Sequence, residues 1–410
     1  MKITKTGPKF PLLVLLLCVL AAPGLGQRNY VPPAGTWDRR TPQQSKLDPV
    51  KLKEAIDFAV ASESRSPRNL ELAHFQTFGR EPYGEPVGPF KERGPATGVI
   101  LCGGYLIAEW GEPARVDMTF SVTKSFLSAT VGLAFDRHLI RSLQDRVVDY
   151  SAPVSAWNPN AKFDRADDFG KSRFIDLFAT ENNRRTTWEH MLRQTSDWEG
   201  KLWGKPDWAD RPDRDASTWL TRKRSEPGAA YEYNDVRVNA LALAALNVWR
   251  RPLPEVLKEY VMDEIGASNA WRWYGYEDAW IVLDGRPVQS VSGGGHWGGG
   301  MFISALDMAR FGLLTSRGGR WGEKQILSPE FVRQAKTPTS VQPTYGFMNW
   351  YLNTDKKLYP SAPATAFAHL GNGTNIIYID PENDLVVVVR WIENNKIDEF
   401  LGKVMASMKK

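Results

Sequence analysis

Residues 120–126 have the sequence Phe-Ser-Val-Thr-Lys-Ser-Phe, and the interpretation of the whole chain depends on this stretch. Ser121 and Lys124 are three residues apart, so a helix places both side chains on one face. A serine hydroxyl is a weak nucleophile that needs a base, and a half-buried lysine near the positive end of a helix can have its pKa lowered enough to accept the proton. The start of such a helix also leaves backbone N–H groups free for an oxyanion hole. The stretch therefore predicts a nucleophile and its base, although a serine cap beside a solvated lysine has the same spacing.

Strand patterns lie on both sides of this stretch. Residues 98–109 contain two apolar runs separated by Gly103 and Gly104, which predict a β-hairpin. Two more strands are predicted at residues 375–379 and 385–391, after a mainly helical middle part. We expect the early hairpin and the late strands to form one antiparallel sheet. The middle part then forms a helical lobe, and the cleft between the lobes is the expected site.

Two further polar patterns follow in the chain. Residues 227–235 have the sequence Pro-Gly-Ala-Ala-Tyr-Glu-Tyr-Asn-Asp, and Tyr233 comes just before a predicted helix over residues 235–249. Residues 367–371 have the sequence Phe-Ala-His-Leu-Gly and precede an apolar strand. Three polar patterns therefore occur in one order, each beside a predicted helix or strand.

These patterns resemble the S-x-x-K, Y-x-N and H-x-G elements of the serine β-lactamase and penicillin-binding-protein family. That family includes class C β-lactamases, D-alanyl-D-alanine carboxypeptidases, β-lactamase-like carboxylesterases and aminohexanoate-oligomer hydrolases. Residues 186–197 and 298–311 also resemble segments of these proteins, so the resemblance covers about residues 95–395. It implies an α+β fold of the β-lactamase/transpeptidase type. An antiparallel sheet flanked by helices is expected, with an all-helical lobe at about residues 125–290 and the active site between them.

The resemblance also implies roles for individual residues. Ser121 attacks a carbonyl carbon and forms an acyl-enzyme, while Lys124 and Tyr233 share the proton transfer. The backbone N–H groups of Ser121 and Asn372 form the oxyanion hole, and Gly371, the last residue of H-x-G, precedes the second of these donors. No metal and no cofactor are implied.

Two positions depart from the family pattern. Asp235 stands where the family usually has asparagine, and its carboxylate either holds Lys124 charged, which weakens the lysine as a base, or serves mainly as the helix N-cap. His369 takes the position of the lysine in the K-T-G form of the third element, and a neutral imidazole holds an anion poorly. We therefore expect an ester or amide substrate without a terminal carboxylate. A register with Tyr231 in place of Tyr233 remains open.

Sixteen tryptophans are unusual for a chain of 410 residues. Five of them lie in the stretch that we expect to overhang the cleft: Trp188, Trp198, Trp203, Trp208 and Trp219. One interpretation is an aromatic wall for acyl chains, amide oligomers or sugars, with Trp198 in contact with the substrate. The other is packing within and between the lobes. His296 lies in a glycine-rich segment near the same cleft and is a further candidate.

Several other functions lack their sequence patterns. The chain contains no G-x-S-x-G elbow, no H-E-x-x-H and no Cys/His cluster at zinc spacing, so neither a Ser-His-Asp hydrolase nor a zinc hydrolase is predicted. No Lys/Arg block indicates nucleic-acid binding. We expect a small-molecule or peptide-like ester or amide substrate and no nucleic-acid partner. The sequence does not indicate an oligomeric state.

Residues 1–26 have the features of a secretory signal peptide. They contain three lysines, an apolar run over residues 12–22 and small residues at 24–26. A periplasmic or secreted protein is expected, without a stable membrane span after cleavage, and a retained anchor is the alternative. Cleavage would lower the net charge from +5 to +2 and remove Cys18, which leaves Cys102 without a partner in the chain.

The remaining chain is predicted to have three parts. Residues 27–95 form an N-terminal arm, with a helix over 50–61 and a loop over 62–96; residues 96–395 form the catalytic domain; and residues 396–410 form a helix that packs on the sheet. The main hypothesis is an exported serine hydrolase that cleaves an ester or amide through an acyl-enzyme. One alternative is a β-lactamase or D-alanyl-D-alanine carboxypeptidase acting on β-lactams or cell-wall peptides. The other is a catalytically impaired binding protein on the same fold.

Overall fold

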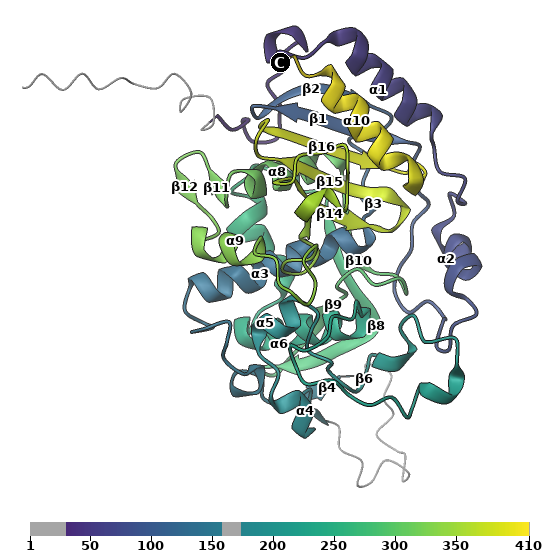
Figure 1. Cartoon of the computed structure of the whole chain (residues 1–410). Helices are drawn as coiled ribbons and strands as arrows, with labels where there is room; N and C mark the ends of the chain where they lie inside the picture. Colours follow the sequence, from purple (N-terminus) through teal and green to yellow (C-terminus); the bar gives the residue numbers. More distant parts are fainter. Residues whose placement is uncertain (1–29, 158–173, 410) are drawn as a thin grey trace, which may run out of the picture.

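The early hairpin and the late strands form one antiparallel sheet, as expected (Figure 1). The computed structural model describes residues 30–157 and 174–409, so the predicted signal peptide lies outside the described residues. Across the sheet, the strands are β13 (Tyr351–Leu352), β14 (Phe367–Gly371), β15 (Asn375–Asp380), β16 (Leu385–Arg390), β1 (Thr97–Cys102) and β2 (Tyr105–Trp110). Strands from the two ends of the chain meet where β1 pairs with β16 along six residues, Thr97 to Cys102.

Helices cover both faces of this sheet, which is why its central strands are continuous apolar runs. Val386 and Val388 of β16 pack into the core beneath α8 (Ala305–Ser316), whereas Val387 and Val389 face the opposite side. There they pack under α1 (Pro49–Ala61) and α10 (Ile397–Ser407), which lie side by side in Figure 1. The helix predicted over residues 50–61 is confirmed, with Asp48 as its N-cap.

The segment predicted as a loop over residues 62–96 contains a helix, α2 (Leu70–Phe78). Asn69 caps it by accepting a hydrogen bond from the Leu72 amide at 2.9 Å. Within α2 only Leu70 and His74 are buried, so the helix lacks the apolar stripe by which a longer helix is found in a sequence. The expectation of a loop was wrong at this point.

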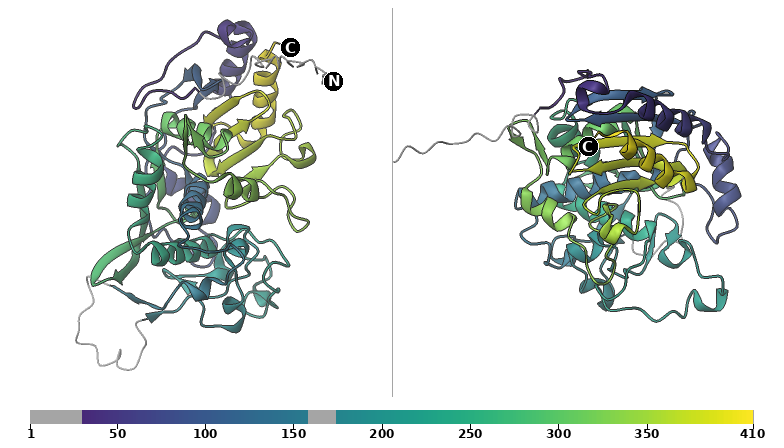
Figure 2. Two further views of the ribbon diagram at one scale, coloured as in Figure 1. Left: turned by 90° about the vertical axis from the view of Figure 1, so that its left-hand side faces the viewer. Right: turned by 45° about the horizontal axis from the view of Figure 1, so that its top comes forward.

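The second lobe contains helices and an additional sheet (Figure 2). Its long strand β8 (Arg272–Leu283) pairs with β9 (Arg286–Val291), β4 (Val154–Ala156) and β10 (Gly300–Ile303), while β5 (Phe174–Ile175) and β3 (Asp117–Met118) complete the sheet. The lobe expected to be all-helical therefore carries strands as well. An irregularity in the pairing of β8 with β9 between Gly275 and Trp280 interrupts the alternation of side chains, which conceals the strand in the sequence.

The remaining helices surround this sheet and the cleft. They are α3 (Thr123–Asp136), α4 (Glu181–Arg184), α5 (Trp188–Leu192), α6 (Asp235–Trp249), α7 (Leu253–Leu257) and α9 (Pro329–Ala335), and the two-stranded pairs are β6 (Lys201–Leu202) with β7 (Lys205–Pro206) and β11 (Arg320–Trp321) with β12 (Lys324–Gln325). Among residues 30–157 and 174–409, no helix combines the length and apolar character needed to cross a bilayer.

Candidate active site

The predicted nucleophile lies on a sharp turn between the two sheets. The chain leaves β3, makes a single 3-10 turn over residues 120–122 and enters α3. Phe120 has a φ of 48°, a left-handed conformation that costs energy in a bulky residue and is common at functional turns. Ser121 is half-buried on this turn, whereas Lys124, one turn later, is fully buried.

Two side chains contact the hydroxyl of Ser121. The ammonium group of Lys124 donates a hydrogen bond to Ser121 Oγ at 2.8 Å, and the hydroxyl of Tyr233 lies 2.6 Å from the same oxygen. The neighbouring Tyr231 instead packs against Tyr345, with ring centres 5.1 Å apart. The structure thus places Tyr233 at the nucleophile and resolves the two registers left open by the sequence.

Asp235 explains how a lysine can be buried at this position. Its carboxylate lies 2.6 Å from the ammonium of Lys124, and both side chains are inaccessible to solvent. The helix N-cap is Asn234, whose side chain accepts from the amides of Val236 and Arg237. The expectation that Asp235 caps the helix is therefore wrong, and the alternative that it holds Lys124 charged agrees with the geometry. Burial alone would lower the pKa of Lys124, but the charge and hydrogen bond of Asp235 raise it above its ordinary value.

A second cation shares the same carboxylate. The guanidinium of Arg211 lies 3.0 Å from Asp235 and 2.6 Å from Asp210, which in turn accepts a hydrogen bond from the backbone amide of Asp235. Burial would raise the pKa of Asp235, but Arg211 and Lys124 hold it well below the usual range. Burial raises the pKa of Asp210 to about 6. Sequence analysis did not single out Asp210 or Arg211, because they lie in a loop of alternating charges that has no motif.

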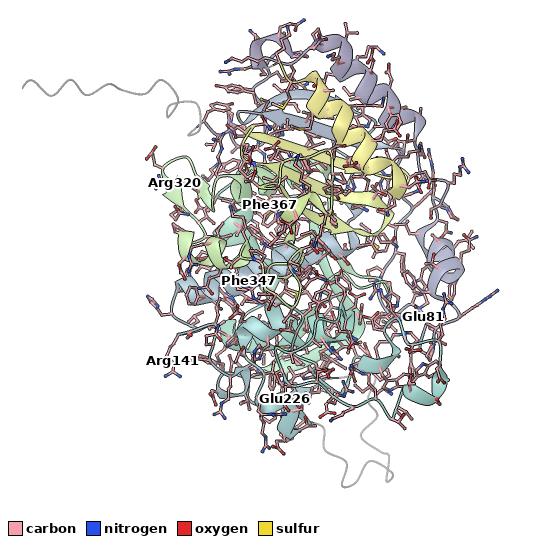
Figure 3. All side chains as sticks on the ribbon, viewed as in Figure 1. Glu81, Arg141, Glu226, Arg320, Phe347 and Phe367 are labelled. Atoms are coloured by element: carbon pink, nitrogen blue, oxygen red, sulfur yellow. The ribbon has the colours of Figure 1, made fainter. Side chains whose placement is uncertain are left out.

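His296 completes this cluster. Its Nδ1 lies 3.2 Å from Asp235, and its Nε2 lies 3.4 Å from Glu81, which is labelled in Figure 3 on the α2 side of the molecule. Although burial lowers it, the pKa of His296 is raised overall by these carboxylates. Atoms of Asp210, Asp235 and His296 that could bind a metal lie within 4.8 Å of one another. Since Lys124 and Arg211 already neutralise these carboxylates, a metal ion would have to displace two cations, and the site does not fit one.

Two glycines allow the backbone segments around Ser121 to come close together. A Cβ atom on Gly371 would lie 2.1 Å from the carbonyl oxygen of Thr119, and one on Gly294 would lie 2.1 Å from that of Phe120. Gly294 also has a φ of +82°, which favours glycine. The close approach at Gly371 brings the predicted oxyanion residue Asn372 to the pocket that contains Ser121.

His369 does not occupy the ligand-facing position that the sequence suggested. Its side chain is fully buried, with Nδ1 2.9 Å from Ser125 Oγ and Nε2 3.3 Å from Thr315 Oγ1. Side chains alternate along β14, so His369 points into the core while Leu370 lines the pocket. Burial lowers the pKa of His369 to about 3, and the ring is therefore neutral. His369 was predicted to be a catalytic residue in the position of the family's lysine, and the structure corrects this role to core packing.

Trp198 is also a core residue. It is 2% exposed, and its indole N–H donates to the carbonyl of Leu177 at 2.6 Å. Trp188 and Trp203 are buried as well. The predicted contact between Trp198 and the substrate is thus wrong, and the alternative of lobe packing holds for it. Burial in the core, which decides between the two interpretations, has no local sequence pattern.

The pocket at the nucleophile has a volume of about 280 Å³. Its lining residues are Phe78, Phe120, Ser121, Arg211, Tyr233, Gly294, His296, Tyr351, Leu370, Gly371 and Asn372. None of these lining residues is a tryptophan. Of the predicted site residues, the structure brings Ser121, Lys124, Tyr233, Asp235, Gly371 and Asn372 together, and it places His369 and Trp198 elsewhere.

Comparisons with known proteins agree with this geometry. A family model described as Beta-lactamase matches residues 93–396. A "Putative D-alanyl-D-alanine carboxypeptidase" of Escherichia coli O157:H7 is 22% identical over 197 residues; the match spans 40% of this chain and only 45% of that protein. Two solved structures share the fold. A penicillin-binding protein homolog from Caulobacter crescentus has 14% identity and a TM-score of 0.53, covering 88% of this chain and 98% of that one. A family VIII carboxylesterase has 16% identity and a TM-score of 0.52, covering 88% and 96%. The match to the family model extends over most of the chain and includes all three motifs, so the chain belongs to the Beta-lactamase family of serine hydrolases.

Proposed function

We propose that this protein cleaves an uncharged ester or amide through an acyl-enzyme on Ser121. The observation that carries the proposal is the pair of contacts to Ser121 Oγ, from Lys124 at 2.8 Å and from Tyr233 at 2.6 Å. A nucleophile needs a partner for its proton within hydrogen-bond distance, and this serine has two candidates. The buried ion pair with Asp235 keeps Lys124 protonated, so we assign proton transfer mainly to Tyr233.

Two cations lie beside the ring of Tyr233. The Lys124 ammonium lies 4.9 Å from the centre of its ring, and the Arg211 guanidinium carbon lies 5.2 Å from it. As the proton of Ser121 passes to Tyr233, these two cations can stabilise the charge that develops during the transfer. In this assignment Lys124 acts as a fixed positive charge, and it also stabilises the developing charge on the serine oxygen.

The reaction then follows in two halves. Ser121 Oγ attacks the carbonyl carbon while its proton passes to the oxygen of Tyr233, and the backbone N–H groups of Ser121 and Asn372 would hold the oxyanion. Tyr233 gives the proton to the leaving oxygen or nitrogen, whose bond to carbon breaks. A water molecule next attacks the acyl carbon and gives its proton to Tyr233. The proton finally returns to Ser121 Oγ as the acid is released.

The charges in the pocket support an uncharged substrate. Arg211 and His296 are the basic side chains that line the pocket, and both already contact carboxylates: Arg211 binds Asp210 and Asp235, and His296 lies beside Asp235 and Glu81. His369, at the position where the family has a lysine, is neutral and buried. A substrate carboxylate would therefore lack an unpaired positive partner among the described residues of the pocket. As substrates, β-lactams and D-alanyl-D-alanine peptides, which carry a carboxylate, are therefore less favoured than uncharged esters and amides.

Intact-mass analysis after reaction with a fluorophosphonate and, separately, with a labelled penicillin tests the proposal. We expect a fluorophosphonate adduct on Ser121 that is lost in Ser121→Ala, and little or no penicillin adduct. A stable or slowly released penicillin adduct would favour the lactam or cell-wall alternative. If neither reagent adds, the hydrolase proposal fails and the impaired binding protein becomes the better account.

Export is a separate proposal that rests on residues 1–26 alone. The basic start, the apolar run and the small residues near position 26 support a cleaved signal. Expression with and without these residues, followed by fractionation and mass measurement of the N-terminus, tests it. A product that keeps Met1 and stays with the membranes would favour a retained anchor.

A further inference from the structure

A second cavity of about 410 Å³ adjoins the pocket at Ser121. The two cavities share the lining residues Phe78, Phe120, His296, Gly371 and Asn372. Its volume is within the roughly 300–1,000 Å³ of small-molecule sites. We call this second cavity the side chamber. Because its wall includes Asn372, a group attached to a carbonyl bound at Ser121 can extend into it.

The outer wall of the side chamber comes from residues 64–78, which precede the part of the chain matched by the family model. One face of α2 supplies most of this wall, with the helical spacing of Leu70, Ala73, His74, Thr77 and Phe78. His74 fixes the helix, since its Nε2 lies 2.6 Å from the carbonyl oxygen of Gly84 and its ring stacks on His296. The opposite face of α2 is exposed, as Leu72 shows with 49% of its surface accessible.

The floor of the side chamber is apolar. Leu70, Phe120 and Trp391 belong to one buried cluster, and Ile392, a buried residue of a second cluster, also lines the chamber. Burying an apolar or aromatic group against such a surface is favourable by roughly 25 cal/mol per Å². The floor therefore suits a hydrocarbon or aryl group.

The charged side chains of the side chamber do not offer a free positive charge. Arg93 is bound by Glu63 at 3.1 Å and by the carbonyls of Ser64, Ser66 and Gly94. Glu393, also in the lining, adds a negative charge. Burial lowers the pKa of His74, so this ring is neutral. Among the described residues, the Nε–H of Arg93 and the Nδ1 of His74 are buried without a hydrogen-bond partner, and the Nε–H of Arg93 could donate to a neutral oxygen.

The position of Tyr233 indicates where the leaving group and the acyl group of a bound substrate lie. In the proposed mechanism Tyr233 gives its proton to the leaving atom, so the leaving group must lie beside Tyr233. Tyr233, Arg211 and Tyr351 line only the pocket at Ser121, whereas Asn372 lines both cavities. The side chamber consequently lies on the acyl side of the scissile bond.

We propose that the side chamber is the acyl-group site and that α2 makes the enzyme selective for bulky, uncharged acyl groups such as aryl-substituted acids. This proposal rests on the serine hydrolase function proposed above. It assigns substrate selectivity to a helix outside the family domain, and no tryptophan of the stretch around residue 200 takes part in it.

Three esters with one leaving group test the proposal: 4-nitrophenyl acetate, 4-nitrophenyl phenylacetate and the 4-nitrophenyl monoester of glutaric acid, which carries a carboxylate. With Ser121→Ala as the blank, we expect kcat/KM for the phenylacetate to exceed that for the acetate by roughly tenfold to a hundredfold, the effect of burying one aromatic ring. The glutarate should react more slowly than the acetate, because its charge enters a chamber with no unpaired cation.

Two substitutions on α2 form a matched pair. Ala73→Phe fills the side chamber, whereas Gln76→Phe adds the same ring to the exposed face of the same helix. Ala73→Phe should lower the ratio of kcat/KM for the phenylacetate to kcat/KM for the acetate about tenfold or more. Gln76→Phe should leave this ratio unchanged. If Ala73→Phe does not fold, as judged by thermal unfolding, Thr77→Phe on the same face replaces it.

The outcomes separate the two proposals. Equal effects of Ala73→Phe and Gln76→Phe, or no preference among the three esters, would overturn the acyl-site assignment. So would fluorophosphonate labelling of Ser121 without turnover of any of the esters. If Ser121 is not labelled and no ester reacts, the hydrolase function itself has failed.

Discussion

The charge cluster beneath Ser121 and the wall of the side chamber are built in opposite ways. Lys124 and Asp235 lie on two long helices inside the molecule and are 0% and 1% exposed. The chamber wall is α2, a nine-residue helix with two buried residues and an exposed outer face. Rigid elements hold a reacting group within the tolerance that chemistry needs, while peripheral segments can vary without loss of the fold. The contrast suggests that reactivity resides in the core and selectivity in the periphery.

The two regions also differ in the free energy that burying their charged groups costs. Taking Lys124 out of water is unfavourable unless its charge has a partner, and Asp235 is that partner. Losing Asp235 would leave Lys124 buried without an anion, and would also remove one of the two carboxylates that bind the partly exposed Arg211. The chamber wall has no such dependence, since its buried cation, Arg93, is bound by Glu63 and by backbone carbonyl oxygens rather than by one shared carboxylate. Changes there should affect substrates more than stability.

The largest effect is expected at the reacting atoms. Tyr233→Phe removes the proton acceptor and should lower kcat/KM about 10²–10⁴-fold for the preferred ester. Tyr231→Phe, two residues away and packed on Tyr345, is the control and should cost less than about tenfold. Initial rates and active-site labelling measure both. Similar losses in the two variants would show that the assigned register, and with it the role of Tyr233, is incorrect.

Next in size is the loss of the shared carboxylate. Asp235→Asn should reduce the free energy of unfolding by about 3–5 kcal/mol, because Lys124 stays buried without its anion. Asp57→Asn breaks an exposed ion pair with Lys53 and should cost no more than about 1 kcal/mol. Urea unfolding at pH 7 compares the variants. Equal costs would mean that the buried cluster is not ionised as described.

A smaller effect concerns the pH dependence of stability at His369. Burial lowers its pKa to about 3, so the stability that the neutral ring provides is complete above pH 6.5 and is lost as the pH falls toward 3, because the unfolded chain takes up a proton first. Between pH 7 and pH 5 the wild-type protein should lose about 2 kcal/mol more stability than His369→Gln. Denaturant unfolding at both pH values measures the difference.

The exposed His138 provides the control for this measurement. His138→Gln should leave the difference in stability between pH 7 and pH 5 as it is in the wild-type protein. The burial argument is refuted if His369→Gln shows the same pH dependence as the wild type.

The smallest effect is expected at the tryptophans that first suggested a substrate wall. Trp208 and Trp219 stack on each other with ring centres 5.4 Å apart and line neither cavity. Trp219→Ala should change the free energy of unfolding by less than about 1 kcal/mol and kcat/KM for the phenylacetate by less than about twofold. A selective loss of aryl-ester turnover in this variant would move the acyl site from α2 to the tryptophan stretch.

Local patterns predicted the parts of the molecule that depend on neighbouring residues. The spacing of Ser121 and Lys124, the hairpin at residues 98–109 and the helix after Tyr233 follow from short-range geometry, and all three are present. The errors concern contacts made over long distances in the chain. Asp235 was assigned two roles that only its neighbours in space could separate, and His369 was placed by its motif although the strand turns its side chain inward.

The sequence by itself determined the family, the sheet that joins the two ends of the chain, and the order of nucleophile, tyrosine and glycine motif. These depend on residue types and on periods of two or about three and a half residues. Only the tertiary structure decided which charges meet under Ser121 and which helix closes the side chamber. Arg211 lies 24 positions from Asp235 in the chain, and α2 lies more than 40 positions from Ser121, so no local pattern encodes these contacts. They arise because burial demands a partner for each charge and a cover for each apolar surface, and the fold supplies both from whichever segment lies nearest in space.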